Sequence, residues 1–145
     1  MPVFSGATIH DIPIGLSVTG SKTVSESDIY LFAGITGDFD PNHVDEEYCR
    51  KTPLGHRVAH GALIIGYMSM GSTRALDGFG APVVSLGYDH VRHTKPVYIG
   101  DTITVRYTIT SIDPERQRVL ADVQVTNQRG ETVAVATHIH KVLSA

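Results

Sequence analysis

The feature that most restricts the fold is the run over residues 59–73, which carries no Asp, Glu, Lys or Arg and contains His60. Its large apolar side chains cover most of a helical circumference rather than a single stripe, which predicts a helix wrapped by other elements. The run is shorter than the ~20 residues that span a bilayer, and it contains several Gly and Ser residues. We therefore expect a buried helix rather than a membrane span.

The second half of the chain has the alternation of half-buried β-strands. Residues 102–110 place Ile, Val or Tyr at every second position between Thr and Arg, and residues 119–125 repeat the pattern. Further strands are expected over residues 16–24, 83–91 and 132–143, with turn-forming sequences between the later ones. Because consecutive strands joined by short turns pair with one another, we predict an antiparallel meander.

The region before the long helix predicts shorter elements. Ser25 followed by Asp28 resembles a capped helix start, so a short helix is expected over residues 26–35, with a turn of helix at 45–50. A sheet with one apolar face beside a buried helix predicts an α+β fold in which the curled sheet surrounds the helix. No internal repeat or linker divides the chain, so residues 1–145 are expected to form a single domain.

Charge and cysteine content exclude several classes of protein. The formal net charge is −3 and no Lys/Arg block exceeds two residues, which argues against a nucleic-acid surface. The single cysteine, Cys49, permits no internal disulfide framework and is expected to be a core thiol, as suits a reducing compartment. Residues 1–15 lack the basic start and apolar core of a secretion signal, so a cytoplasmic location without membrane association is expected.

Polar residues that can carry chemistry gather just before the long helix. Gly37 and Pro41 place Asp38 in a loop, with His43 and His60 nearby in the sequence. A carboxylate and an imidazole around one water can remove and deliver a proton, provided that both reach it. The simpler readings are a loop-capping aspartate and a structural histidine.

Three separated motifs carry a family resemblance: DxxPxHxD at 38–45, RVAHGxL at 57–63 and RxxxPVxxGDT at 92–102. In this order they resemble the MaoC-like (R)-specific enoyl-CoA hydratase family. The resemblance implies a hot-dog fold, with a sheet wrapped around a long central helix. It also implies reversible hydration of a trans-2-enoyl-CoA to the (R)-3-hydroxyacyl-CoA, without metal or redox cofactor, in a homodimer or a dimer of dimers.

The resemblance also implies roles for individual residues. Asp38 and His43 would activate the water, and the backbone amide of Gly61 would donate to the thioester oxygen, where a helix N-terminus favours developing negative charge. A glycine there also suits close approach of a ligand, although packing alone is an alternative reason for it. His60 would support the site and Arg57 would meet a phosphate or pair structurally.

Five positions depart from the family pattern. Asn42 and Ala62, which are expected to contact substrate, replace more apolar residues, and His56 and His93 replace aromatic ones, so the resemblance leaves acyl specificity open. Asp40 stands where the family usually has Asn, two residues from Asp38, where it would either raise the pKa of that group or cap the loop. Branched or dicarboxylic acyl-CoA substrates, a non-catalytic acyl-binding subunit and thioester hydrolysis are the alternatives. The pairs His56/His60, His90/His93 and His138/His140 lie on different expected elements, so no metal site is predicted.

Overall fold

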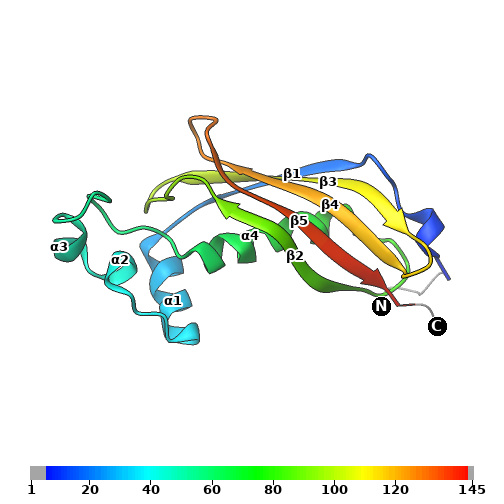
Figure 1. Ribbon diagram of the computed structural model, residues 1–145, viewed down its shortest axis with the longest axis horizontal. Helices are drawn as coiled ribbons and strands as arrows, with labels where there is room; N and C mark the ends of the chain where they lie inside the picture. The colour runs from blue at the N-terminus through cyan, green and yellow to red at the C-terminus, as the bar shows by residue number, and fades with distance from the viewer. Residues whose placement is uncertain (1–5, 144–145) are drawn as a thin grey trace.

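The computed structural model describes residues 6–143, and the ends of the expected domain at 1–5 and 144–145 lie outside the described residues. Figure 1 shows an elongated molecule with one long helix, α4, along a face of a sheet. The elements are η1 (Ile9–Asp11), β1 (Ser17–Thr23), α1 (Glu26–Thr36), α2 (Pro41–Val44), α3 (Glu46–Cys49), α4 (Gly61–Ala75), β2 (Val83–His93), β3 (Thr102–Asp113), β4 (Arg118–Thr126) and β5 (Thr132–Val142). None of the described helices is long and apolar enough to cross a bilayer.

The five strands form one antiparallel sheet in the order β1-β3-β4-β5-β2. The predicted meander is confirmed for β3, β4 and β5, but it is wrong for β2, which pairs with β5 at the far edge. The link over residues 94–101 is too long for a tight hairpin and carries the chain across to β3 in the middle of the sheet. The two edge strands, β1 and β2, are therefore the first two strands in sequence order.

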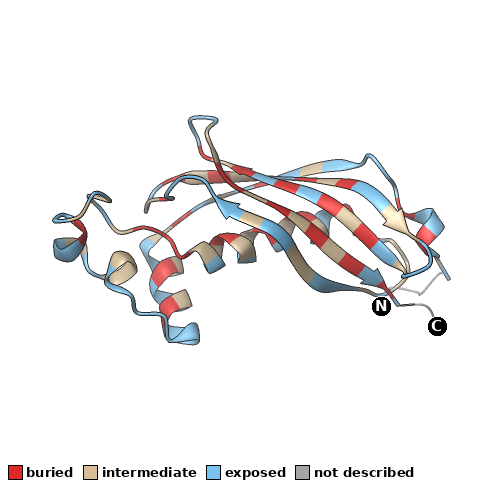
Figure 2. Cartoon of the chain, in the orientation of Figure 1, coloured by how far each residue is buried: buried red, intermediate tan, exposed pale blue. Residues whose placement is uncertain are grey.

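The predicted alternation is confirmed in β3 and β4, whose apolar positions are buried while most of their neighbours are partly or fully exposed (Figure 2). The buried face packs on α4, and Gly71 lies in close contact with it. A Cβ on Gly71 would lie 2.6 Å from the Cβ of Tyr107 in β3. Glycine is needed at this position because any side chain would push the helix away from the sheet.

The prediction that other elements cover most of the circumference of α4 is wrong for a single chain. Only Ile64, Met68, Gly71 and Ala75 are buried, and they form one face with helical spacing. Other positions such as Ala62, Gly66 and Ser69 are exposed. The sequence pattern reports how apolar a helix is, but not how many of its sides the same chain covers.

The segment that carries the candidate site lies at one end of the molecule, beyond the sheet (Figure 1). Ser25 and Asp28 form the expected capping box of α1, and Gly37 ends that helix with a left-handed backbone conformation (φ 81°). Residues 38–40 then form the expected loop. The predicted turn of helix near 45–50 is present as α3, and Cys49 within it is buried.

Candidate active site

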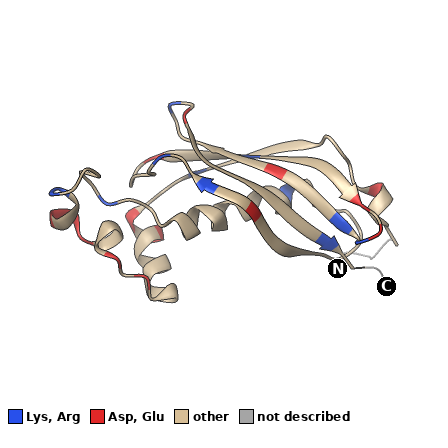
Figure 3. Ribbon diagram, in the orientation of Figure 1, with Lys and Arg blue, Asp and Glu red and all other residues tan. Residues whose placement is uncertain are grey.

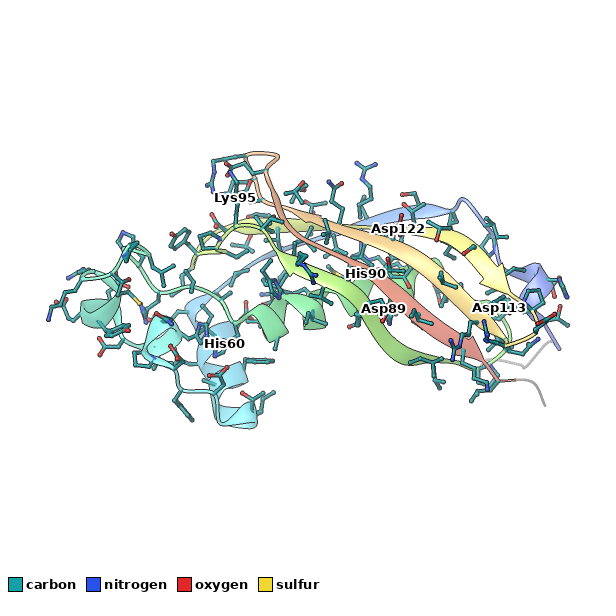
Figure 4. All side chains as sticks on the ribbon, in the orientation of Figure 1. His60, Asp89, His90, Lys95, Asp113 and Asp122 are labelled. Atoms are coloured by element: carbon teal, nitrogen blue, oxygen red, sulfur yellow. The ribbon has the colours of Figure 1, made fainter. Side chains whose placement is uncertain are left out.

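Asp38, His43 and His60 converge where the loop after α1 meets the start of α4. One carboxylate oxygen of Asp38 and one ring nitrogen from each histidine all lie within 4.8 Å of one another. Asp38 is exposed, His43 is half-buried and His60 is buried, so the group has one side in solvent and one side in protein. Figure 4 shows His60 at this end of the molecule, close to α1 and α2. The sequence therefore predicted the residues that the fold brings together.

The ring of His43 is held in one tautomer by a backbone carbonyl. Its Nδ1 lies 2.7 Å from the carbonyl oxygen of Val58, and since a carbonyl only accepts, Nδ1 must carry the hydrogen. Val58 is itself fixed, because its N–H donates to the carbonyl of Asn42 and it forms a β-bridge with Tyr98. The neutral ring therefore leaves Nε2 unprotonated, as a base requires.

His60 orders both members of the pair. Its Nε2 donates to the carbonyl oxygen of Asp38 at 3.0 Å, and its ring stacks on His43 with 3.8 Å between centroids. On the other side it contacts the ring of Phe32. The buried Nδ1 of His60 has no hydrogen-bond partner among the described residues. These contacts fit the expected supporting role better than proton transfer, because the ring is enclosed and only 1% exposed.

One carboxylate and two imidazoles are also a plausible donor set for a metal ion. The ring geometry disfavours it. An imidazole binds a metal in its own plane, at ~2.0–2.1 Å for zinc, whereas these two rings stack with only 29° between their planes. Two such planes do not share a point at coordination distance from both nitrogens. The arrangement suits a water bound between hydrogen-bonding groups.

Gly61 begins α4, and His60 occupies the N-cap position. No acceptor for the Gly61 N–H is present within residues 6–143, as is usual in the first turn of a helix. A Cβ on Gly61 would lie 2.7 Å from Nε2 of His93, so the packing explanation for this glycine also holds. Both residues line a pocket of about 380 Å³ with Ile64 and Val97. A ligand carbonyl at this N–H would therefore have His93 as a neighbour, a contact that the sequence did not predict.

Asp40 caps the loop. Its Oδ1 accepts from the N–H of Asn42 at 2.9 Å, which makes Asp40 the N-cap of α2. Its own N–H lies 3.4 Å from Oδ1 of Asp38, so its backbone faces that carboxylate while its side chain is engaged elsewhere. The carbonyl of Asn42 accepts a hydrogen bond from the N–H of Val58. Because the carbonyl of Val58 in turn accepts from the ring of His43, the backbone of Asn42 helps to position that ring.

Arg57 is held by acidic and aromatic side chains of the site segment, whose acidic residues are marked in Figure 3. Its guanidinium contacts Glu26 at 2.5 Å, Glu46 at 3.3 Å and the hydroxyl of Tyr30 at 3.0 Å. Hydrogen bonds from His56 and Arg57 lower the pKa of Glu46 to about 2. These contacts support the structural alternative for Arg57, because they leave its charge balanced within the chain. Ala62 is exposed on the first turn of α4.

Sequence reasoning did not predict that His138 and His140 lie on the buried face of β5. They are 0% and 4% exposed, on the same side of the strand as the buried Ala134, Ala136 and Val142. The spacing of two residues could have shown that they share a face, but Val133 and Val135 gave the opposite face an apolar character as well.

Known proteins with similar sequences and folds give a consistent picture. A family model described as "MaoC like domain" matches residues 13–131. An (R)-specific enoyl-CoA hydratase from Rhodospirillum rubrum is 43% identical over 110 residues, covering 76% of this chain and 74% of the relative. A 3-hydroxybutyryl-CoA dehydratase from Methylorubrum extorquens is 37% identical over 109 residues, covering 75% and 68%.

Solved structures agree with the expected fold. The unliganded R-hydratase PhaJ1 from Pseudomonas aeruginosa superposes with a TM-score of 0.80 at 27% identity, covering 97% of this chain and 88% of that one. A hot-dog-like protein from Thermanaerovibrio acidaminovorans superposes with a TM-score of 0.66 at 20% identity, covering 94% and 87%. The predicted α+β hot-dog fold is therefore confirmed.

Proposed function

Because this chain belongs to the MaoC-like dehydratase family, we propose that it reversibly hydrates a trans-2-enoyl-CoA to the (R)-3-hydroxyacyl-CoA. The broader class, an enzyme of the hydratase/dehydratase type that acts on acyl-CoA, follows from relatives that carry these names. The finer assignment rests on the site. Its main support is the convergence of Asp38, His43 and His60 beside the N-terminus of α4.

In the proposed hydration, a water lies between the carboxylate of Asp38 and Nε2 of His43. Nε2 accepts a proton as the water oxygen attacks C3, and Asp38 orients the water by accepting its other hydrogen. The pair then supplies the proton that C2 requires, so that the net change is addition of H to C2 and OH to C3. The reverse sequence eliminates water. His60 takes no proton and keeps the loop and the ring of His43 in place.

The charge that develops on the thioester oxygen needs a donor. In the proposal the free N–H of Gly61 points to this oxygen, and the dipole of the fifteen-residue α4 adds to the stabilisation. A helix N-terminus supplies this donor without reorganisation during the reaction. The polar ring of His93 against Gly61 would limit how a substrate enters, because it occupies the space beside the glycine.

Crotonyl-CoA hydration by purified variants tests the assignment. Asp38→Asn and His43→Gln should each lower kcat/KM by at least ~100-fold, as is typical for loss of an acid–base group. The matched control is Asp40→Asn, which changes the neighbouring carboxylate in the same way but retains a good helix cap. It should keep both activity and the circular dichroism spectrum. If both dyad variants keep activity, the mechanism is wrong.

The products distinguish the remaining possibilities. Chiral analysis of the 3-hydroxyacyl product tests the (R) configuration. A panel with branched and carboxylate-bearing enoyl-CoAs tests the alternative substrates, and release of free CoA from a saturated acyl-CoA would indicate thioester hydrolysis. A purified protein that binds acyl-CoA without turnover would favour the reading as a non-catalytic subunit.

The proposed assembly is a homodimer. Leu31, Ile35 and Phe39 are 67%, 81% and 58% exposed around the site segment, and one side of α4 is uncovered. β2 also presents an edge of the sheet with exposed Leu86. Exposed apolar surface beside a free strand edge is typical of a subunit interface. Sedimentation at micromolar concentration would test this, and a stable monomer that retains activity would contradict it.

A further inference from the structure

A second buried polar cluster lies outside the catalytic group, in the middle of the sheet. The hydroxyl of Tyr107 lies 3.2 Å from Nδ1 of His138 and 3.2 Å from Nδ1 of His140. Nε2 of His138 is 2.8 Å from the hydroxyl of Ser85, and the ring stacks on Tyr88 with 3.8 Å between centroids. Buried polar groups of this kind need an explanation, because an apolar face would be the ordinary choice for a core strand.

Ser85, Tyr88, His138 and His140 of this cluster line a pocket of about 640 Å³. Ile65, Ser69 and Ser72 line the opposite wall, and Tyr88, His138 and His140 are among the residues of the sheet side. The lining begins on α4 one helical turn after Gly61. Ser69 is eight residues from Gly61, which is ~12 Å along the helix axis. The pocket residues of α4 therefore lie within the reach of a medium-length acyl chain whose carbonyl is placed at Gly61.

The hydrogens of the cluster can be arranged in two ways. If Tyr107 donates to Nδ1 of His138, then Nδ1 of His140 donates to Tyr107 and its Nε2 is an acceptor. If Tyr107 donates to His140 instead, Nε2 of that ring carries a hydrogen and is a donor. Within residues 6–143 the side-chain hydrogen bond of His140 is made by Nδ1, so its Nε2 has no partner there. The buried hydroxyl of Tyr88 has no partner there either. The pocket thus offers the Nε2 of His140, which can donate or accept, together with the hydroxyls of Tyr88, Ser69 and Ser72.

The charge around the pocket limits the ligand. Its lining contains no Lys or Arg, and Asp77 is part of it. Burial holds both rings in the neutral form, since it lowers the pKa of His138 to about 3 and that of His140 to about 4. A carboxylate would therefore meet a negative charge and no cation. An uncharged oxygen would meet groups that can satisfy it, whereas a plain alkyl chain would remove water from those groups without replacing its hydrogen bonds.

We propose that this pocket receives the distal part of the acyl chain and that His140 binds an uncharged hydroxyl or keto oxygen on it. The proposal rests on the proposed function for the position of the thioester, and it deepens that function by naming the substrate class. The preferred substrates are then oxygenated enoyl-CoAs of medium length rather than dicarboxylic ones.

Binding is the direct test, because it does not require turnover. Saturated acyl-CoAs that end in a methyl, a hydroxyl or a carboxylate group are compared by titration calorimetry over a series of chain lengths. At the length that reaches His140, the hydroxylated ligand should bind about tenfold more tightly than the plain one, as one additional hydrogen bond predicts. The carboxylated ligand should bind more weakly than either.

Two pocket variants and one control accompany the titration. His140→Val should bring the hydroxylated and plain ligands to within about twofold of each other. Tyr88→Phe removes only the hydroxyl and should reduce the preference if His140→Val does not fold. His10→Ala removes an exposed imidazole elsewhere and should leave the preference unchanged.

The proposal is overturned if plain ligands bind as tightly as hydroxylated ones at every length, if the preference survives both pocket variants, or if no acyl-CoA binds saturably. Hydration of crotonyl-CoA, whose short chain does not reach the pocket, is measured in parallel. If the wild-type protein hydrates crotonyl-CoA but shows no preference for hydroxylated ligands, only the proposed role of the pocket is refuted. A protein that shows the preference but hydrates no enoyl-CoA refutes only the proposed reaction.

Discussion

The contact between α4 and β3 allows the same substitution to be tested with opposite signs in one helix. Gly71 and Gly66 both lie inside α4, but a Cβ on Gly71 would lie 2.6 Å from the Cβ of Tyr107, whereas a Cβ on Gly66 would meet nothing within 4 Å. In an exposed helix interior Ala is favoured over Gly by ~0.8–1.0 kcal/mol. Gly66→Ala should therefore raise the free energy of unfolding by about 1 kcal/mol.

Gly71→Ala gains the same helix propensity but must displace the helix, because the Cβ of Tyr107 is attached to the backbone of β3 and cannot rotate away. Overpacking of a core typically costs ~1–3 kcal/mol. The net effect should be a loss of up to about 2 kcal/mol, so the two variants should differ by about 1–3 kcal/mol. For a chain of 145 residues this corresponds to roughly 2–12 °C in Tm.

Urea unfolding followed by circular dichroism measures both free energies, and calorimetry measures Tm. A further control is Gly34→Ala in α1, where a Cβ would also meet nothing within 4 Å. It should behave like Gly66→Ala. If Gly71→Ala is as stable as Gly66→Ala, the helix does not approach the sheet as closely as described.

Three further predictions concern the site and the buried cluster. His60→Phe keeps the ring stack on His43 but loses the bond to the carbonyl of Asp38; kcat should fall by ~3- to 10-fold with little change in KM, and His60→Gln should restore part of it. Dialysis against a chelator should leave crotonyl-CoA hydration unchanged, and recovery by added zinc after a loss would contradict the stacked-ring argument. Because burial lowers the pKa of His138 and His140 below 6.5, the unfolded chain takes up protons first as the pH falls. Stability should decrease from about pH 6.5 toward pH 4 by at most ~1.4 kcal/mol per pH unit for each histidine, and His140→Val should flatten this slope in urea titrations at several pH values.

Local patterns predicted the elements well where one face is buried. The strict alternation in β3 and the cap at Ser25 and Asp28 are both effects of neighbouring residues, and both are present. The position of β2 beside β5 depends instead on pairing between strands that are distant in sequence, which no local pattern reports. The uncovered side of α4 could not be predicted for a similar reason, since polarity does not reveal which molecule covers a surface.

In the candidate site, too, some features could be predicted from the sequence and others depended on the folded backbone. The resemblance selected Asp38 and His43, and the fold brings them together with His60. The role of Asp40 depended on whether its side chain turned to the carboxylate or to the N–H of Asn42, and that choice is made by the backbone of a single turn. The buried His138 could not be distinguished from an exposed histidine, because each of the two faces of β5 carries Val or Ala residues and either face could have been the buried one.

The length of α4 has a consequence for how such an enzyme can change its specificity. In the proposed arrangement the first residue of this helix binds the thioester and its middle lines the acyl pocket, so α4 sets the distance between the reacting carbonyl and the pocket. Each residue inserted between them would increase this distance by ~1.5 Å and rotate the pocket residues by ~100° about the helix axis. A change of substrate length by insertion would thus require whole turns of ~5.4 Å, whereas exchange of side chains such as Ser69 or His140 can change depth and polarity without moving the reacting end.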